Sequence, residues 1–201
     1  MQEQTRSIQI PLPLEIRWHG RGGQGAVTAA KLLAEITVEA GFFVQSFPQF
    51  GSERRGAPIA AFTRIDHKEI TLYTTIQEPN VLIILDSSLL ETGATLKGLQ
   101  PDGLLLVNST SSPQEIRAQR QLQVKHLATV EATKIGWECL NRPMPNIAIL
   151  GALLAIIKLF AINKVIDQLS LTFKKSFNEK LAAGNLQAFL EGTKSVMIDI
   201  G

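Results

Sequence analysis

Cysteine is nearly absent from this sequence: the 201 residues contain one, Cys139. One thiol cannot form an internal disulfide, and alone it cannot hold an iron–sulfur cluster or a structural zinc ion. We therefore expect no metal site on this chain, and a place in the core for Cys139. A single thiol is also typical of a reducing compartment.

Strong net charge and long apolar runs are missing as well. The formal charge is +2, which gives no reason to expect nucleic acid or an anionic membrane as a partner. The most apolar stretch, residues 147–157, is too short to span a bilayer and is followed by Lys158. Residues 1–13 lack the basic start and apolar run of a signal peptide. These absences favour a cytoplasmic protein.

Glycine, in contrast, is concentrated in one short segment, EIRWHGRGGQG, at residues 15–25. The segment begins as a strand, turns at the glycines and enters a helix expected over residues 24–40. This arrangement leaves backbone N–H groups pointing at an anion. The residues that we expect to contact a phosphate or cofactor here are Gly20, Arg21, Gly22, Gly23, Gln24 and Gly25.

The glycine turn has three open interpretations. Its G-x-G-x-x-G spacing matches the dinucleotide fingerprint, which also requires an acidic residue near the end of the second strand. Residues 44–47 contain no acid, so NAD binding is disfavoured. The glycines otherwise either let the helix pack close to the strand, or contact a phosphate, a cofactor or a partner's backbone. Arg21 is accordingly a solvated loop residue or a clamp for an anion, and Gln24 orients a neighbour or only favours the helix.

A second motif, FPQFGSERRGAP at residues 47–58, places Arg54 and Arg55 in a glycine-flanked loop. The two arginines belong either to a solvated loop or to a charged lip at a ligand site or subunit interface. Because a guanidinium can bind phosphate with two parallel hydrogen bonds, we include both among the candidate cofactor-binding residues.

The remaining polar candidates have simpler structural roles. His19 is expected to be a hydrogen-bonded histidine at a strand end rather than a catalytic base. Asp86 and Asn108 end two expected strands, where open α/β sheets bind ligands, although a turn or helix-N-terminal carboxylate is the preferred role for Asp86. No nucleophile, metal cluster or acid–base pair is evident, so no catalytic residue is assigned.

Apolar runs and turn signals predict the fold. Expected strands are residues 14–19, 42–47, 58–65, 69–73, 81–85, 104–107 and 122–127, and later helices are residues 130–140, 146–160, 162–169 and 176–190. The runs 58–65 and 69–73 predict a hairpin, which makes the sheet mixed. We expect an α/β fold: one three-layer α/β/α domain over residues 14–192, with a mixed, mostly parallel central sheet, a Rossmann-like start and a helical C-terminal part. Residues 1–13 would be a leader and residues 193–201 a C-terminal tail.

Four sequence blocks, in this order, resemble one known family. They are GRGGQGAVTAAKLLAE at residues 20–35, FPQFGSERRGAPIAAFTRI at 47–65, EPNVLIILD at 78–86 and NRPMPNIAILGALL at 141–154. Together they resemble the gamma subunit, or gamma domain, of the pyruvate/2-oxoacid:ferredoxin (flavodoxin) oxidoreductases, most closely the pyruvate type. The resemblance covers about residues 14–192.

The resemblance implies a role in a larger enzyme. Members of this family oxidatively decarboxylate a 2-oxoacid, transfer the acyl group to coenzyme A and pass electrons to ferredoxin or flavodoxin. Their thiamine diphosphate is held chiefly by the alpha and beta subunits, and their iron–sulfur clusters lie on a cysteine-rich delta subunit or on the beta subunit. This chain would be a gamma subunit that binds no cofactor alone and is inactive without these partners.

The resemblance also implies where this subunit acts. Coenzyme A phosphates would lie near the Gly20–Gly25 turn and Arg54–Arg55, and partners would cover apolar surface at residues 147–157 or in the FPQFG loop. The alternatives are a freestanding Rossmann-like nucleotide-binding protein and a purely structural interaction module.

Overall fold

The computed structural model describes residues 8–49, 56–91 and 93–201. Within these residues the strands are β1 (Leu14–Arg21), β2 (Phe43–Gln49), β3 (Pro58–Asp66), β4 (Val81–Ile84), β5 (Leu104–Asn108), β6 (His126–Val130) and β7 (Met197–Ile200). The helices are α1 (Ala26–Glu39), α2 (Pro113–Arg120), α3 (Ala132–Leu140), α4 (Asn146–Ile157), α5 (Ile162–Ser176) and α6 (Glu179–Ser195), with two short 3-10 helices, η1 (Ser87–Leu90) and η2 (Ala94–Leu96).

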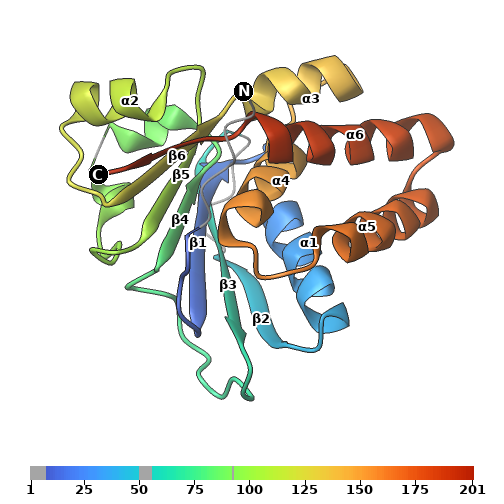
Figure 1. The fold of residues 1–201 in the computed structure, drawn as a ribbon, viewed down its shortest axis with the longest axis horizontal. Helices are drawn as coiled ribbons and strands as arrows, with labels where there is room; N and C mark the ends of the chain where they lie inside the picture. Colours follow the sequence, from blue (N-terminus) through green and yellow to red (C-terminus); the bar gives the residue numbers. More distant parts are fainter. Residues whose placement is uncertain (1–7, 50–55, 92) are drawn as a thin grey trace.

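The strands of the described chain form one sheet in the order β2-β3-β1-β4-β5-β6-β7 (Figure 1). Pairing is parallel in the centre, at β1–β4, β4–β5 and β5–β6. It is antiparallel toward both edges, at β2–β3, β1–β3 and β6–β7. The mixed sheet expected from the sequence is therefore confirmed, with parallel pairing confined to its middle.

Helices cover both faces of the sheet, as the three-layer prediction requires. Figure 1 shows α1, α4, α5 and α6 on one side and α2 on the other. The strand side chains divide accordingly: Ile16 and Trp18 of β1 belong to the large core under α1 and α4, whereas Leu82 and Ile84 of β4 belong to a smaller core with Ile116 of α2. Alternate residues along a strand point to opposite faces, so the two cores follow from the pattern of apolar residues.

Helix α4 lies at the centre of the larger core. It is apolar all round, and Ile149, Leu150 and Leu153 are fully buried, as expected for a helix surrounded by protein. A Cβ atom on Gly192 of α6 would lie 2.0 Å from the Ala148 carbonyl oxygen, so glycine is what lets α6 pack closely on α4. The expectation that residues 147–157 supply exposed surface is therefore wrong.

The expected hairpin between residues 58–65 and 69–73 is also wrong. Residues 69–73 are not a strand, and β3 pairs instead with β2, from Phe43 opposite Asp66 to Gln49 opposite Ala60. Arg64 of β3 donates a hydrogen bond from Nη1 to the Leu72 carbonyl oxygen, 2.9 Å away. This bond links the 69–73 segment to the Arg64 side chain rather than to the backbone of a strand.

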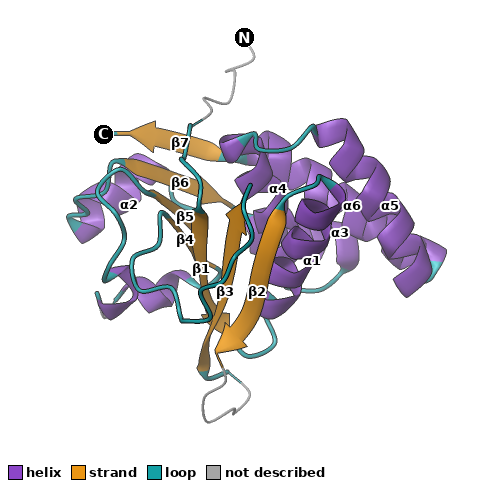
Figure 2. Ribbon diagram, turned by 90° about the horizontal axis from the view of Figure 1, so that it is seen from below, coloured by secondary structure: helices purple, strands orange, loops and turns teal. Residues whose placement is uncertain are grey.

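Both ends of the domain contribute to the fold. Residues 197–200, assigned from the sequence to a tail, form β7 and pair with β6 at the edge of the sheet (Figure 2). Within the expected leader, Ile8 is buried, and its N–H donates to the Ile156 carbonyl oxygen at 3.1 Å. No helix in the described parts of the chain is both long and apolar enough to cross a membrane.

Candidate functional site at the glycine turn

The glycine turn joins the carboxyl end of β1 to the start of α1. Gly25 caps α1 in the left-handed conformation, with φ 81°, and a Cβ atom there would lie 2.6 Å from Nδ2 of Asn146. Gly20 is also tightly packed, since a Cβ atom would lie 3.3 Å from Cβ of Leu85. Close packing thus accounts for both glycines: Gly20 lies against the start of α1 and the end of β4, and Gly25 lies against Asn146 of α4. The N–H of Gly22 donates to the Ala57 carbonyl oxygen at 3.0 Å.

Arg21 is held by three groups at the tip of this turn. Its Nε atom lies 3.1 Å from Oδ2 of Asp86, its Nη2 atom donates to Oγ of Ser88 at 2.8 Å, and its Nη1 atom donates to the Gly56 carbonyl oxygen at 3.2 Å. The side chain keeps 38% of its surface exposed. Arg21 is therefore a positioned arginine, not a freely solvated loop residue.

Gln24 links the turn to the same carboxylate. Its Nε2 atom donates to Oδ2 of Asp86 at 2.9 Å, and its Oε1 atom accepts the N–H of Arg21 at 2.7 Å. Of the two roles considered for Gln24, the structure supports the one in which its side chain orients a neighbour.

Asp86 is the shared acceptor of this network. Its Oδ1 atom accepts hydrogen bonds from the backbone N–H and the hydroxyl of Ser88, which makes Asp86 the N-cap of η1. Burial alone raises the pKa of the carboxyl, but hydrogen bonds from Ser88 and Gln24 and the charge of Arg21 outweigh it and hold the pKa below its ordinary value. A carboxylate with four donors is a structural anchor, in line with the turn role preferred from the sequence, and not a free base.

The N-terminus of α1, directly after this network, has no side-chain cap and no acidic residue in its first turn. The first N–H groups of a helix have no partner within the helix, and among the described residues no other group accepts those of residues 26–28. Val27 in this turn is 39% exposed. These amides and the helix dipole favour an anion.

A polar cavity of about 310 Å³ opens beside the glycine turn, at the carboxyl ends of the parallel strands. Gln24, Asp86, Asn108 and Lys134 are among its lining residues. Asn108 is itself satisfied, because Nδ2 donates to the Leu85 carbonyl oxygen and to Oγ1 of Thr133, whose N–H donates to Oδ1. Asn108 therefore ties β5 to α3 rather than offering a free ligand group.

The sheet order explains the missing acid of the dinucleotide pattern. In that pattern the second strand lies beside the first and places the acid next to the ribose. Here β3 runs antiparallel between β1 and β2. The end of β2 is thus one strand further from the glycine turn, which agrees with the expectation that NAD is disfavoured.

His19, which precedes the turn, differs from its prediction. Its Nε2 atom is buried and has no hydrogen-bond partner among the described residues. Burial, with the nearby charge of Arg17, lowers the pKa of His19 to about 4. The imidazole is therefore neutral at physiological pH and is a poor general base at neutral pH.

The remaining predicted residues lie either outside the described part of the chain or outside the network around Asp86. Arg54 and Arg55 lie outside the described residues. Gly23 has open space around its Cα and a φ of 101°, so only its backbone conformation calls for glycine. Cys139 is partly buried, and burial followed by the charges of Glu191 and Glu138 raises the pKa of its thiol. No group of three or more metal-binding side chains is found in the described part of the chain.

Ser88 and Asn146 complete the site but were not singled out from the sequence. Ser88 follows Asp86 by two residues, the spacing of a side chain that caps its own turn. Asn146 lies within the NRPMPNIAILGALL block, and its contact with Gly25 gives that block a role in shaping the turn.

Comparison with known proteins finds relatives over most of the chain. The family model of pyruvate ferredoxin/flavodoxin oxidoreductase matches residues 15–195. The gamma subunit common to the pyruvate and ketoisovalerate oxidoreductases of Pyrococcus abyssi is 48% identical over 176 residues, which are 88% of this chain and 95% of that protein. Pyruvate synthase subunit PorC of Methanocaldococcus jannaschii is 41% identical over 90% of this chain and 98% of its own length.

A solved structure shares the fold. The pyruvate oxidoreductase subunit PORC of Thermotoga maritima superposes with a TM-score of 0.80 at 34% identity, covering 92% of this chain and 98% of that one. With sequence blocks, topology and these relatives in agreement, the chain belongs to the pyruvate ferredoxin/flavodoxin oxidoreductase family.

Proposed function

We propose that this chain is the gamma subunit of a 2-oxoacid:ferredoxin oxidoreductase that converts pyruvate and coenzyme A to acetyl-coenzyme A and carbon dioxide. The names of its relatives support this assignment, because gamma subunits and PorC subunits of pyruvate-oxidising enzymes align over nearly their whole length. Electrons would pass to ferredoxin or flavodoxin through the assembled enzyme. A cytoplasmic location stays a prediction.

The donor set of this chain does not fit the redox cofactors of such an enzyme. An iron–sulfur cluster needs several cysteine thiolates, and the sequence has only Cys139. We therefore assign the clusters to partner subunits of the beta or delta type, and the resemblance to the family implies that thiamine diphosphate is held by the alpha and beta subunits. The gamma chain would contribute surface and coenzyme A contacts.

The uncapped N-terminus of α1 is the observation that carries the coenzyme A proposal. Its amides at residues 26–28 lack partners among the described residues, and no acid lies in this turn to compete with a phosphate. Arg21 adds to it, because the described residues use three of its five N–H donors, and an anion at the turn can bind the other two. Arg54 and Arg55 are included in the proposed coenzyme A site because of their positive charge.

Exposed apolar side chains support a subunit role. Tyr73 is 84% exposed and Leu72 54%, on the segment that follows β3, and Val38, Trp137 and Leu171 are exposed on the helices. A contiguous exposed apolar patch is typical of a surface that a partner covers, and Val38 of α1 and Leu171 of α5 line one shallow pocket. They replace residues 147–157 as the candidate interface.

A variant in the first turn of α1 tests the coenzyme A contact. Val27→Glu places a carboxylate among the free amides, which favours the helix through its dipole but competes with a phosphate. In the assembled enzyme we expect the KM for coenzyme A to rise about tenfold, equivalent to about 1.4 kcal/mol, with the KM for pyruvate unchanged. Val27→Gln, of similar size and no charge, is the matched control.

The result separates the alternatives. The KM for coenzyme A could be the same in Val27→Glu, Val27→Gln and the unmodified enzyme. That result would contradict a phosphate contact and leave a purely structural module as the interpretation of this chain. Loss of assembly in both variants would assign the turn to a subunit interface. The freestanding nucleotide-binding alternative is disfavoured by the β3 strand that separates β2 from β1.

A further inference from the structure

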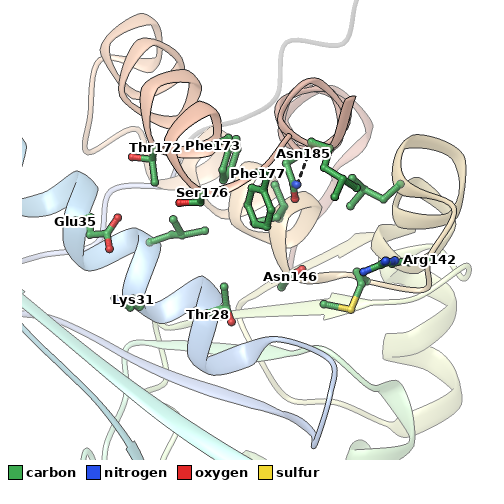
Figure 3. Close-up of a pocket in the computed structure, with 15 residues that line it drawn as sticks. Thr28, Lys31, Glu35, Arg142, Asn146, Thr172, Phe173, Ser176, Phe177 and Asn185 are labelled. Carbon is green, nitrogen blue, oxygen red and sulfur yellow. Dashed lines mark hydrogen bonds between the residues drawn. The ribbon is translucent and has the colours of Figure 1, made fainter. Parts of the chain in front are cut away.

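A second cavity, of about 390 Å³, lies between α1, α5 and α6 (Figure 3). Its size is in the range of small-molecule sites. It is separate from the polar cavity at the strand ends, with which it shares no lining residue. Neither the family relationship nor the coenzyme A proposal uses it.

The walls of this cavity are mostly apolar. Phe173 is 2% exposed and packs within the core, whereas Phe177 is 43% exposed and stands at the opening. Leu32 of α1 and Ile147 of α4, both buried, add apolar side chains to the lining. A flat or branched apolar group would be buried between these side chains, and burying it is favourable in proportion to its area.

Two buried carboxamides line the same cavity. Asn146 is 4% exposed and Asn185 8%. The Nδ2 atom of Asn185 donates to the Leu181 carbonyl oxygen in its own helix, at 2.8 Å. Among the residues that the structure describes, neither Oδ1 of Asn185 nor the carboxamide of Asn146 has a hydrogen-bond partner. None of these carboxamide atoms is among the buried side-chain atoms that lack a partner in the described part of the chain, so they are accessible from the cavity and available to the polar atoms of an occupant.

Charge is distributed unevenly around the cavity. In Figure 3 Arg142 lies toward the same end as Asn146 and Asn185, and Glu35 lies toward the opposite end. No ion pair of Arg142, Lys31 or Glu35 is found in the described part of the chain. Two cations and one carboxylate favour a ligand with one negative charge, and Glu35 disfavours a second acid group at the far end.

We propose that this cavity binds a small organic monoacid with an aromatic or branched apolar body. The carboxylate lies toward Arg142 and the carboxamide of Asn146, and the body packs against Phe173 and Phe177. The contact of Asn146 with Gly25 places this site directly behind the glycine turn.

The test uses the full-length chain and 3-(4-fluorophenyl)propionate as the probe, followed by its ¹⁹F signal in a titration. We expect saturable binding that weakens at least fivefold in Arg142→Gln and in Phe177→Ala, whose side chains are exposed enough for the fold to persist. Lys174→Gln, which removes a cation on α5 outside the cavity lining, should bind as the unmodified chain does.

The neutral probe 3-(4-fluorophenyl)propanamide measures the contribution of charge, and acetate measures that of the apolar body. The proposal requires both to bind at least fivefold more weakly than the fluorinated acid. It is overturned if the acid does not bind, if the amide binds equally well, or if Arg142→Gln and Lys174→Gln weaken binding to the same extent. None of these outcomes depends on coenzyme A.

Discussion

Nε of Arg21 lies 3.1 Å from Oδ2 of Asp86; Arg21 ends β1, and Asp86 follows the end of the neighbouring parallel strand, β4. The pair joins the glycine turn after β1 to the 3-10 helix after β4. Gln24 and Ser88 complete the same network. The position of the α1 N-terminus therefore depends on a carboxylate that is distant in sequence.

Replacing that carboxylate should loosen the turn. Asp86→Asn removes the charge that Arg21 faces and the acceptor capacity used by Gln24, and we expect a loss of about 1–2 kcal/mol in the free energy of unfolding. The exposed Asp102, which pairs with Lys125 at 2.7 Å, provides the control. Chemical denaturation should give an unchanged midpoint for Asp102→Asn.

The effect of Asp86→Asn should depend on pH. The pKa of Asp86 is lowered in the folded protein, so its stabilisation is present above the unfolded pKa, about 3.9, and is lost as the pH falls through the folded value. The stability difference between the two proteins should be full at pH 7 and shrink in acid. A difference that is constant down to pH 2 would contradict this role.

Gly25 and Gly41 form a matched pair for measuring the packing of Asn146. Both have positive φ, 81° and 83°, but a Cβ atom on Gly41 meets nothing within 4 Å. Gly41→Ala should cost about 1–2 kcal/mol for backbone strain alone. Gly25→Ala adds overpacking against Asn146, so we expect more than about 3 kcal/mol. Thermal unfolding that ranks the two equally would argue against the contact.

His19 should make stability depend on pH. Its pKa is about 4 in the folded protein and 6.5 ordinarily, so the unfolded chain binds a proton that the folded chain does not between these values. Stability should therefore fall as the pH drops from 6.5 to about 4, by up to about 3 kcal/mol. His19→Gln should flatten this slope. Equal slopes in the variant and the unmodified protein would rule out the buried neutral imidazole.

Local features of this site could be predicted from the sequence, because strand, glycine turn and helix follow one another within residues 14–40. The partners of Arg21 could not, since Asp86 and Ser88 reach it only through the parallel pairing of β1 with β4. The strands themselves were likewise easier to predict from the sequence than their pairing. The sequence predicts β2, but its place beside β3 depends on which segment pairs with the free edge of β3. Met197–Ile200 is a short edge strand whose partner, β6, is far away in sequence.

The central claim is that this chain works as a gamma subunit, and isolation from its native cell tests it most directly. A tagged chain would be recovered under anaerobic conditions, and the eluate assayed for pyruvate- and coenzyme A-dependent reduction of a viologen dye. The account predicts activity together with larger subunits that carry thiamine diphosphate and iron–sulfur clusters. A monomeric, inactive chain recovered alone from cells that hold the active enzyme would contradict it.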